Sequence, residues 1–231
     1  MLEKIKEKVL KANLLLPKHG LITFTWGNAS EIDRSVGLVV IKPSGVEYSA
    51  LKVEDMVVVD LAGKIIEGRL NPSSDTATHL EIYKAWPEIN GIVHTHSCYA
   101  TSWAQARKEI PCYGTTHADY IRGSVPVTRK LTDRELIEYE KNIGLTIVET
   151  FKGKDYKATP CILCSNHGPF TWGKDSLEAV HNAIVLEECA KMALFTELIS
   201  PESSPAPTNI QDKHYYRKHG EKAYYGQLSR S

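Results

Sequence analysis

The chain has 231 residues, of which 42 % are hydrophobic and 24 % are charged. This length and composition suit one globular domain with a sizeable core. Lysine plus arginine number 28, as do aspartate plus glutamate, so no overall charge attracts the protein to nucleic acid or to an anionic membrane. We therefore expect its partner to be a small molecule or another protein.

The N-terminal third predicts one helix followed by short strands. Residues 2–16 carry apolar side chains at helical spacing, and Pro17 should end this helix. Its charges are too frequent for a signal peptide, and no run in the chain approaches the roughly 18 apolar residues of a membrane span. Apolar runs at 21–25, 37–42 and 56–60, divided by turn residues, predict strands. Because they follow one another closely, part of the sheet should be antiparallel.

Helices and strands alternate in the rest of the chain. We predict helices over 75–86, 99–106, 131–140 and 175–198, and strands from Gly91, over 146–151 and over 161–164. This pattern favours an α/β fold: a layered α/β/α arrangement around a central, partly antiparallel sheet, in a single domain spanning 1–231. Residues 200–208 resemble a linker, and the segment 209–231 beyond it is aromatic and basic.

The five cysteines are an odd number, which argues against a disulfide framework and favours a reducing, cytoplasmic location. Cys161 and Cys164 have no second pair at the spacing that a zinc ribbon requires. In a strand, their side chains would also point to opposite faces. We expect buried free thiols.

Two histidines interrupt the predicted strand that starts at Gly91. His94 and His96 are two residues apart, and side chains at that spacing return to the same face of a strand. A catalytic zinc site needs about three protein ligands and an open position. His167, which follows the predicted strand 161–164, is the natural third ligand. The three histidines therefore predict a metal site.

Nucleotide-binding motifs are not supported. The stretch "GPFTWGKDS" (168–176) nearly matches a P-loop, but Asp175 stands where the hydroxyl that binds magnesium is needed. A carboxylate at that position would lie where phosphate should bind. The chain also contains no G-x-G-x-x-G sequence.

Small polar turns at 26–30, 42–45 and 72–75 offer amide N–H groups and hydroxyls. Backbone nests and helix N-termini bind phosphate well, so three such turns together favour a small phosphorylated substrate. The loop 114–120 gathers hydroxyl, imidazole, carboxylate and phenol groups. Within it, Asp119 could be a general base or an N-cap.

Together these motifs resemble the class II aldolase family, which includes L-fuculose-phosphate aldolase, and within it the L-ribulose-5-phosphate 4-epimerases. The likeness extends over nearly the whole chain. It is carried by "LPKHGLITFTWGNAS", "VIKPSGVEY", "PSSDTATH", "GIVHTHS", "GTTHADY", "NHGPFTWGK", "AVHNAIVLEE" and "DKHYYRKHGEKAYYGQ". Aldolases of this family typically have glutamate after the two serines of the third motif. Here that residue is Asp75, as in the epimerases.

The resemblance implies a set of site residues. His94, His96 and His167 would hold one divalent ion per subunit, zinc in the first place with manganese or cobalt as alternatives, and Asp75 would lie beside it as a ligand or a neighbour. The implied substrate-binding residues are Asn28, Lys42, Ser44, Gly45, Ser73, Ser74, Thr115 and His214. Asp119 and Tyr225 would be the acid/base pair, with the C-terminal segment of a neighbouring subunit supplying Tyr225. The family assembles as a C4 homotetramer with its active sites between subunits.

The implied reaction interconverts L-ribulose 5-phosphate and D-xylulose 5-phosphate, as in arabinose catabolism or in ascorbate- and gulose-type routes. The C4 hydrogen of a 2-ketopentose is β to the carbonyl, so enolisation alone does not invert C4. Retro-aldol cleavage of C3–C4, rotation of glycolaldehyde and re-addition would invert it, with a metal ion stabilising the charge of the cleaved fragment. An aldolase that releases its fragments and a non-catalytic interaction domain are the alternatives.

Overall fold

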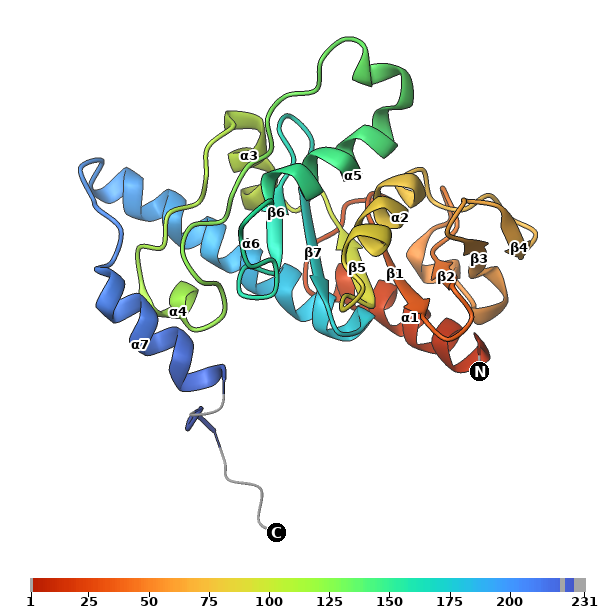
Figure 1. The fold of residues 1–231 in the computed structure, drawn as a ribbon, viewed down its shortest axis with the longest axis horizontal. Coiled ribbons are helices and arrows are strands. Elements are labelled where there is room, and N and C mark those ends of the chain that lie inside the picture. The colour runs from red at the N-terminus through yellow and green to blue at the C-terminus, as the bar shows by residue number, and fades with distance from the viewer. Residues whose placement is uncertain (1, 221–222, 227–231) are drawn as a thin grey trace.

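The structure is a computed structural model that describes residues 2–220 and 223–226 (Figure 1). A seven-stranded sheet lies at its centre in the order β4-β3-β2-β1-β5-β7-β6, and every pair of neighbouring strands in it is antiparallel. The strands are β1 (Asn28–Asp33), β2 (Leu38–Ile41), β3 (Val57–Asp60), β4 (Ile65–Glu67), β5 (Gly91–His94), β6 (Cys161–Leu163) and β7 (Pro169–Gly173). The α/β class and the central sheet are as predicted.

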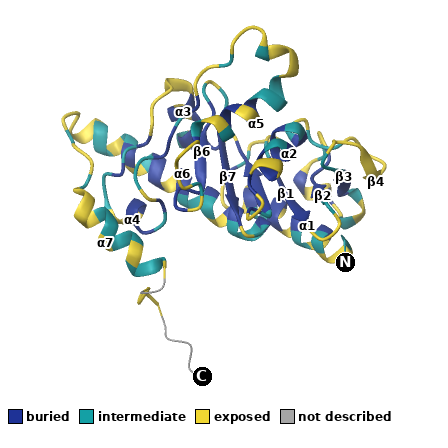
Figure 2. Cartoon of the chain, viewed as in Figure 1, coloured by how far each residue is buried: buried dark blue, intermediate teal, exposed yellow. Residues whose placement is uncertain are grey.

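Helices cover both faces of this sheet. The α-helices are α1 (Leu2–Lys18), α2 (Thr76–Ala85), α3 (Cys98–Ala106), α4 (Thr115–Ala118), α5 (Tyr139–Thr150), α6 (Ser176–Ile199) and α7 (Thr208–Lys218). The 3-10 turns are η1 (Tyr48–Ala50), η2 (Val53–Asp55) and η3 (Glu135–Glu138). In Figure 1, α2 and α5 lie on one side of the sheet and α1 and α6 on the other. Figure 2 shows that the central strands are almost wholly buried, whereas the edge strand β4 is exposed.

Alternation along the strands explains the two layers. Val39 and Ile41 of β2 pack with α2 and α5 in one cluster, whereas Val40 between them packs with Val9 of α1 in another. Successive strand residues point to opposite faces, so a run of apolar residues buries both sides of the sheet. Both faces of β2 are therefore core.

Several predicted elements are wrong. Residues 21–25 are not a strand: Trp26 N–H bonds Thr23 O in a turn, and Phe24 has a left-handed φ of 53°. Residues 146–150 belong to α5 and Phe151 is its C-cap residue; Ile143 and Ile147, one helical turn apart, are buried in the same core cluster. Helix α1 continues through Pro17 and ends one residue later.

The predicted helix 131–140 is replaced by η3, which leads directly into α5. The Glu135 carboxylate accepts hydrogen bonds from the N–H and hydroxyl of Thr132 at the start of this turn. Strands β1, β4 and β7 were not predicted. The five cysteines are free thiols, and Cys161 and Cys164 are buried as expected.

Gly91 begins β5 where α6 crosses it. A Cβ at this position would lie 2.1 Å from the Asp175 carbonyl carbon and 2.2 Å from the Ser176 nitrogen. We therefore expect Gly91→Ala to lower the free energy of unfolding by about 3 kcal/mol, because the added methyl group would clash with backbone atoms, which cannot move aside as the end of a flexible side chain can. Urea unfolding measures this. Gly114→Ala is the control, since Gly114 has an ordinary φ of −148° and open space around it. Equal unfolding midpoints for the two variants would contradict the prediction.

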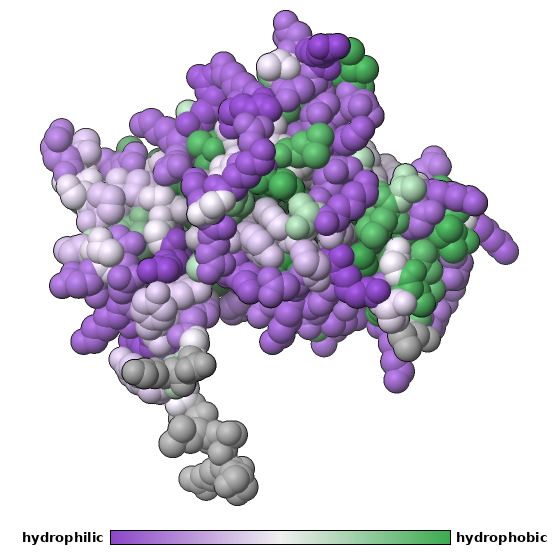
Figure 3. Space-filling model, viewed as in Figure 1, coloured by the Kyte–Doolittle hydropathy of each residue, from purple (hydrophilic) through white to green (hydrophobic). Residues whose placement is uncertain are grey.

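Hydrophilic side chains predominate on the face seen in Figure 3, and hydrophobic ones form separate patches there. Among the helices of the described residues, none has the length and apolar character needed to cross a bilayer.

Candidate metal centre and active site

The three predicted histidines meet at one end of the central strands. One ligand atom from each of His94, His96 and His167 can be chosen so that all lie within 4.8 Å of one another. His94 is the last residue of β5, His96 lies two residues beyond it, and His167 precedes β7. Because β5 pairs with β7, with His94 opposite Phe170, the sheet itself brings the two chain segments together.

The His94 ring is held so that one nitrogen is free for a ligand. It is fully buried and stacks on Phe170 at a centroid distance of 4.2 Å. Its Nδ1 lies 2.9 Å from Pro169 O; since a carbonyl only accepts, Nδ1 must carry the proton. Nε2 is then a bare acceptor, and it is buried without a partner among the described residues, as is Nδ1 of His167. Such orphaned nitrogens fit a metal ion.

Burial also keeps these rings neutral. It lowers the pKa of His94, of His96 and of His167, the last to about 4. Neutral imidazole is the form that binds a divalent ion. The three histidines therefore supply the donor set of a catalytic metal site with further positions open.

Asp75 lies beside the histidines. It occupies the N-cap position of α2, but its carboxylate makes no capping hydrogen bond. Instead Oδ2 accepts a hydrogen bond of 2.7 Å from Asn28 Nδ2 and lies 4.0 Å from His94 Nε2. Burial would raise the pKa of Asp75, yet the neighbouring histidines and the Asn28 hydrogen bond outweigh it and lower the pKa. Asp75 is thus a carboxylate available to the site.

A cavity of about 390 Å³ contains the metal centre and all three polar turns. Its two turns 42–45 and 72–75 are joined by backbone hydrogen bonds, Ser44 N–H to Asn71 O and Ser73 N–H to Lys42 O. The site residues that line it are Asn28, Lys42, Ser44, Gly45, Ser73, Ser74, Asp75, His96 and His167, with Thr25, Trp26, Gly27 and Pro43. Residues of all three segments therefore line one cavity, although residues 28–30 of the first segment begin β1 and are not a turn.

Lys42 is the cation of this cavity. It is 1 % exposed, its Nζ donates to Pro43 O at 3.2 Å, and it lies 4.7 Å from the centre of the Tyr48 ring. Burial lowers its pKa to about 8. No carboxylate neutralises it within salt-bridge distance among the described residues, so its charge is available for an anionic ligand.

A second cluster forms around Asp119, at the other predicted acid/base position. Asp119 ends α4 and does not cap a helix N-terminus. Arg217 donates to both carboxylate oxygens, at 2.8 and 2.5 Å, while His214 Nδ1 lies 3.0 Å and Lys218 Nζ 3.6 Å from them. Partial burial raises the pKa of Asp119, but these partners outweigh it and lower the pKa.

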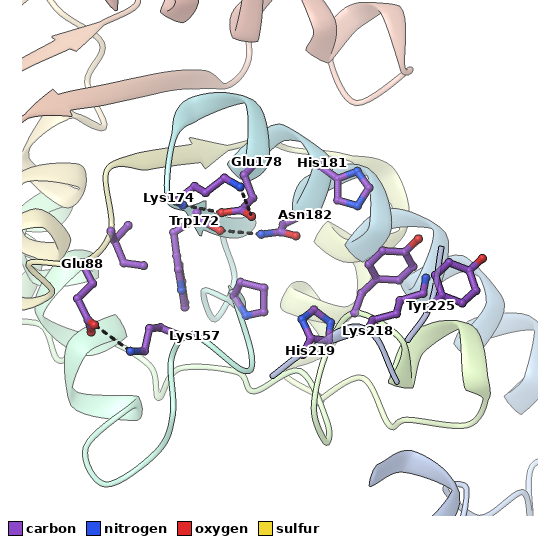
Figure 4. A pocket seen from close by; sticks show the side chains of 14 residues that line it. Glu88, Lys157, Trp172, Lys174, Glu178, His181, Asn182, Lys218, His219 and Tyr225 are labelled. Atoms are coloured by element: carbon purple, nitrogen blue, oxygen red, sulfur yellow. Dashed lines mark hydrogen bonds and ion pairs between the residues drawn. The ribbon is translucent and has the colours of Figure 1, made fainter. Parts of the chain in front are cut away.

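Tyr225 belongs to the same cluster. Its ring lies 4.9 Å from the Arg217 guanidinium and 4.4 Å from Lys218 Nζ. Figure 4 shows Tyr225, Lys218 and His219 on one side of a second cavity, of about 550 Å³, and the Glu88–Lys157 ion pair on the other. Thr115 begins α4 and is exposed.

The predicted residues therefore form two groups within one chain. Among the described residues, none of the Asp119 cluster lines the cavity of the histidines. Sequence reasoning missed Arg217 and Trp26, whose ring lies 6.3 Å from that of His96. It also missed His79, which is buried next to Asp75 on α2. For Arg217, the available signal was its position one helical turn after His214.

Comparisons with known proteins agree with this geometry. The family described as class II aldolase and adducin N-terminal domain matches residues 7–194. An L-fuculose 1-phosphate aldolase structure is similar with a TM-score of 0.80 and 27 % identity, covering 91 % of this chain and 94 % of that one. The L-fuculose-1-phosphate aldolase of Thermus thermophilus has a TM-score of 0.69 and 25 % identity, covering 87 % and 100 %. A Klebsiella pneumoniae protein, for which aldolase, epimerase and decarboxylase are named as alternatives, has a TM-score of 0.71 and 25 % identity, covering 91 % and 97 %.

Proposed function

The chain belongs to the class II aldolase and adducin family, and from this premise we propose that it interconverts L-ribulose 5-phosphate and D-xylulose 5-phosphate. The observation that carries the proposal is the pair of separate clusters. One supplies metal ligands, Asp75 and a cavity with a lysine and hydroxyls. The other supplies a carboxylate and a phenol that lie outside this cavity.

Epimerisation at C4 needs more proton-transfer groups than cleavage alone. The C4 hydroxyl has to lose and regain its proton in two configurations, so a group is needed on each face of the aldehyde. Asp119 and Tyr225 are proposed for these two roles. A divalent ion on the three histidines, zinc being the first choice, would supply Lewis-acid stabilisation of negative charge on the substrate.

The two clusters would meet in an assembly of several copies. Asp119, His214 and Tyr225 of one chain would face the histidines and Asp75 of its neighbour. A closed ring repeats such a head-to-tail contact at each interface, and a C4 homotetramer is the ring we propose. Within a single chain, the clusters line different cavities.

Lys42 gives the proposed phosphate site a pH dependence. Its pKa of about 8 means that its charge is present below pH 8 and is lost above it, whereas an ordinary lysine stays charged to about pH 10. We therefore expect the dissociation constant of inorganic phosphate to rise about tenfold per pH unit above 8.5. Calorimetric titration between pH 7.5 and 9.5 measures it. In Lys42→Arg the rise should disappear, because arginine keeps its charge; the same rise in that variant would contradict the assignment.

The direct test is incubation of the purified, metal-loaded protein with L-ribulose 5-phosphate. The proposal expects D-xylulose 5-phosphate and no accumulation of free dihydroxyacetone phosphate. Dihydroxyacetone phosphate and glycolaldehyde as the main products would instead establish an aldolase, the second candidate, which is favoured by the similarity to L-fuculose-phosphate aldolases. Absence of both reactions would refute the proposal.

A further inference from the structure

A chain of three buried polar groups lies beside Asp75 and was not among the predicted site residues. His79, Ser30 and Tyr83 are each 0 % exposed. Ser30 Oγ lies 2.7 Å from His79 Nδ1 and 2.7 Å from the Tyr83 hydroxyl. Burying three polar side chains together is costly unless each has a partner, so their arrangement calls for a reason.

The distances favour one direction for the hydrogen bonds that join these three groups. The other acceptor near the Tyr83 hydroxyl is Asn90 O, at a long 3.4 Å, and that carbonyl already accepts from Ile32 N–H at 2.9 Å. The contact of the Tyr83 hydroxyl with Ser30 Oγ is much shorter, at 2.7 Å, and this favours Tyr83 as the donor to Ser30, which leaves the Ser30 proton for His79 Nδ1. Because Nδ1 accepts, the neutral imidazole carries its proton on Nε2. Burial keeps the ring neutral by lowering its pKa to about 3.

The protonated Nε2 lies on the side of the ring away from Ser30. It is buried and has no partner among the described residues. Asp75 stands four residues earlier at the start of α2, and residues at that spacing lie on the same face of a helix. The edge of the His79 ring also meets Phe170, on which His94 stacks. His79 thus lies behind both the carboxylate and the metal centre.

We propose that His79 is a positioning residue for Asp75: the Tyr83–Ser30 chain fixes its Nε2–H tautomer, and this N–H, which makes no hydrogen bond to any described residue, acts on the nearby Asp75 carboxylate through its dipole and favours the orientation of that carboxylate toward the three histidines. A neutral donor suits the place, because a cationic side chain there would repel a divalent ion. The part that Asp75 plays in turnover rests on the proposed function. The tautomer of His79 and its effect on metal binding are independent of the proposed function.

Two substitutions separate the two sides of the ring. In His79→Gln the side-chain amide nitrogen can occupy the position of the histidine Nε2. In His79→Asn the side chain is shorter, and its amide nitrogen reaches only the position of Nδ1. We expect His79→Asn to bind Zn²⁺ about 10- to 100-fold more weakly than His79→Gln, as is usual when a group behind a metal site is lost. In the Asp75→Asn background this difference should vanish, because its target is gone. Equal Zn²⁺ affinities in the native background, or a difference that persists without Asp75, would overturn the proposal.

Nuclear magnetic resonance of the metal-free protein labelled with ¹⁵N-histidine reads the tautomer directly. The His79 signals, identified by their loss in His79→Gln, should show a protonated Nε2 and a bare Nδ1. A protonated Nδ1 would overturn the proposal even if a variant failed to fold. A protein with the expected tautomer and affinities but no epimerase activity would refute the proposed function alone.

Discussion

The His96→Asn variant is expected to purify with almost no divalent metal and to turn over on the order of 10³-fold more slowly, because a metal Lewis acid contributes several kcal/mol and each 1.4 kcal/mol is a factor of ten. Two imidazoles alone form a weak site, and catalytic zinc typically has three protein ligands. His96 is the informative choice because it lies beyond the end of β5. His94 is fully buried on Phe170, so its loss would also disturb the core.

Metal content after dialysis measures the first effect and the turnover rate measures the second, while the thermal midpoint of the metal-free protein shows whether the variant still folds. The matched control is His19→Asn, since His19 is an exposed histidine just after α1. It should keep both metal and turnover. Full metal content in His96→Asn would show that the three histidines do not act as one site.

Tyr225→Phe should give the opposite pattern, with metal retained and turnover reduced by about 10²- to 10⁴-fold, the usual contribution of a general acid or base. Within one chain, the Tyr225 side chain lines a different cavity from the one that His96 and His167 line. Tyr224→Phe is a close control: both tyrosines are exposed, and both backbone N–H groups bond Arg217 O. Of these two tyrosines, only Tyr225 has its ring against Arg217 and Lys218 in the described structure.

Mixing the two inactive variants tests where Tyr225 acts. If each site takes its histidines from one copy and its tyrosine from another, reassembled equal mixtures of His96→Asn and Tyr225→Phe should recover about one quarter of the wild-type activity, since each half is intact in half of the copies. A site within one chain would recover none. Full activity of Tyr225→Phe alone would refute the two-sided mechanism.

The metal centre could be predicted because its signal is local. His94 and His96 show the period of two of a strand, and His167 follows a short apolar run, so three donors near strand ends were visible. The turns with Lys42, Ser73 and Ser74 had the composition of phosphate-binding loops. What sequence could not supply was the pairing of β5 with β7, which alone places His94 and His167 together.

Other features depend on tertiary contacts. Residues 146–151 are rich in β-branched and aromatic side chains, yet 146–150 form the end of α5 and Phe151 caps it, because packing in the core outweighs local propensity. Strand β7 was obscured by its resemblance to a phosphate loop. His79 looked like an ordinary helix residue, and only the structure shows that its ring is buried between Ser30 and the site.

The pairing of β5 with β7 has a consequence for folding. His94 and His167 come from distant parts of the chain, so an ion that binds both closes a long loop, as a disulfide would. Such a site does not exist in the unfolded chain, and the free energy of binding therefore adds to that of folding. An ion bound there would therefore lengthen the survival of the native protein under heat or proteolysis, and chelation would shorten the lifetime of the whole sheet.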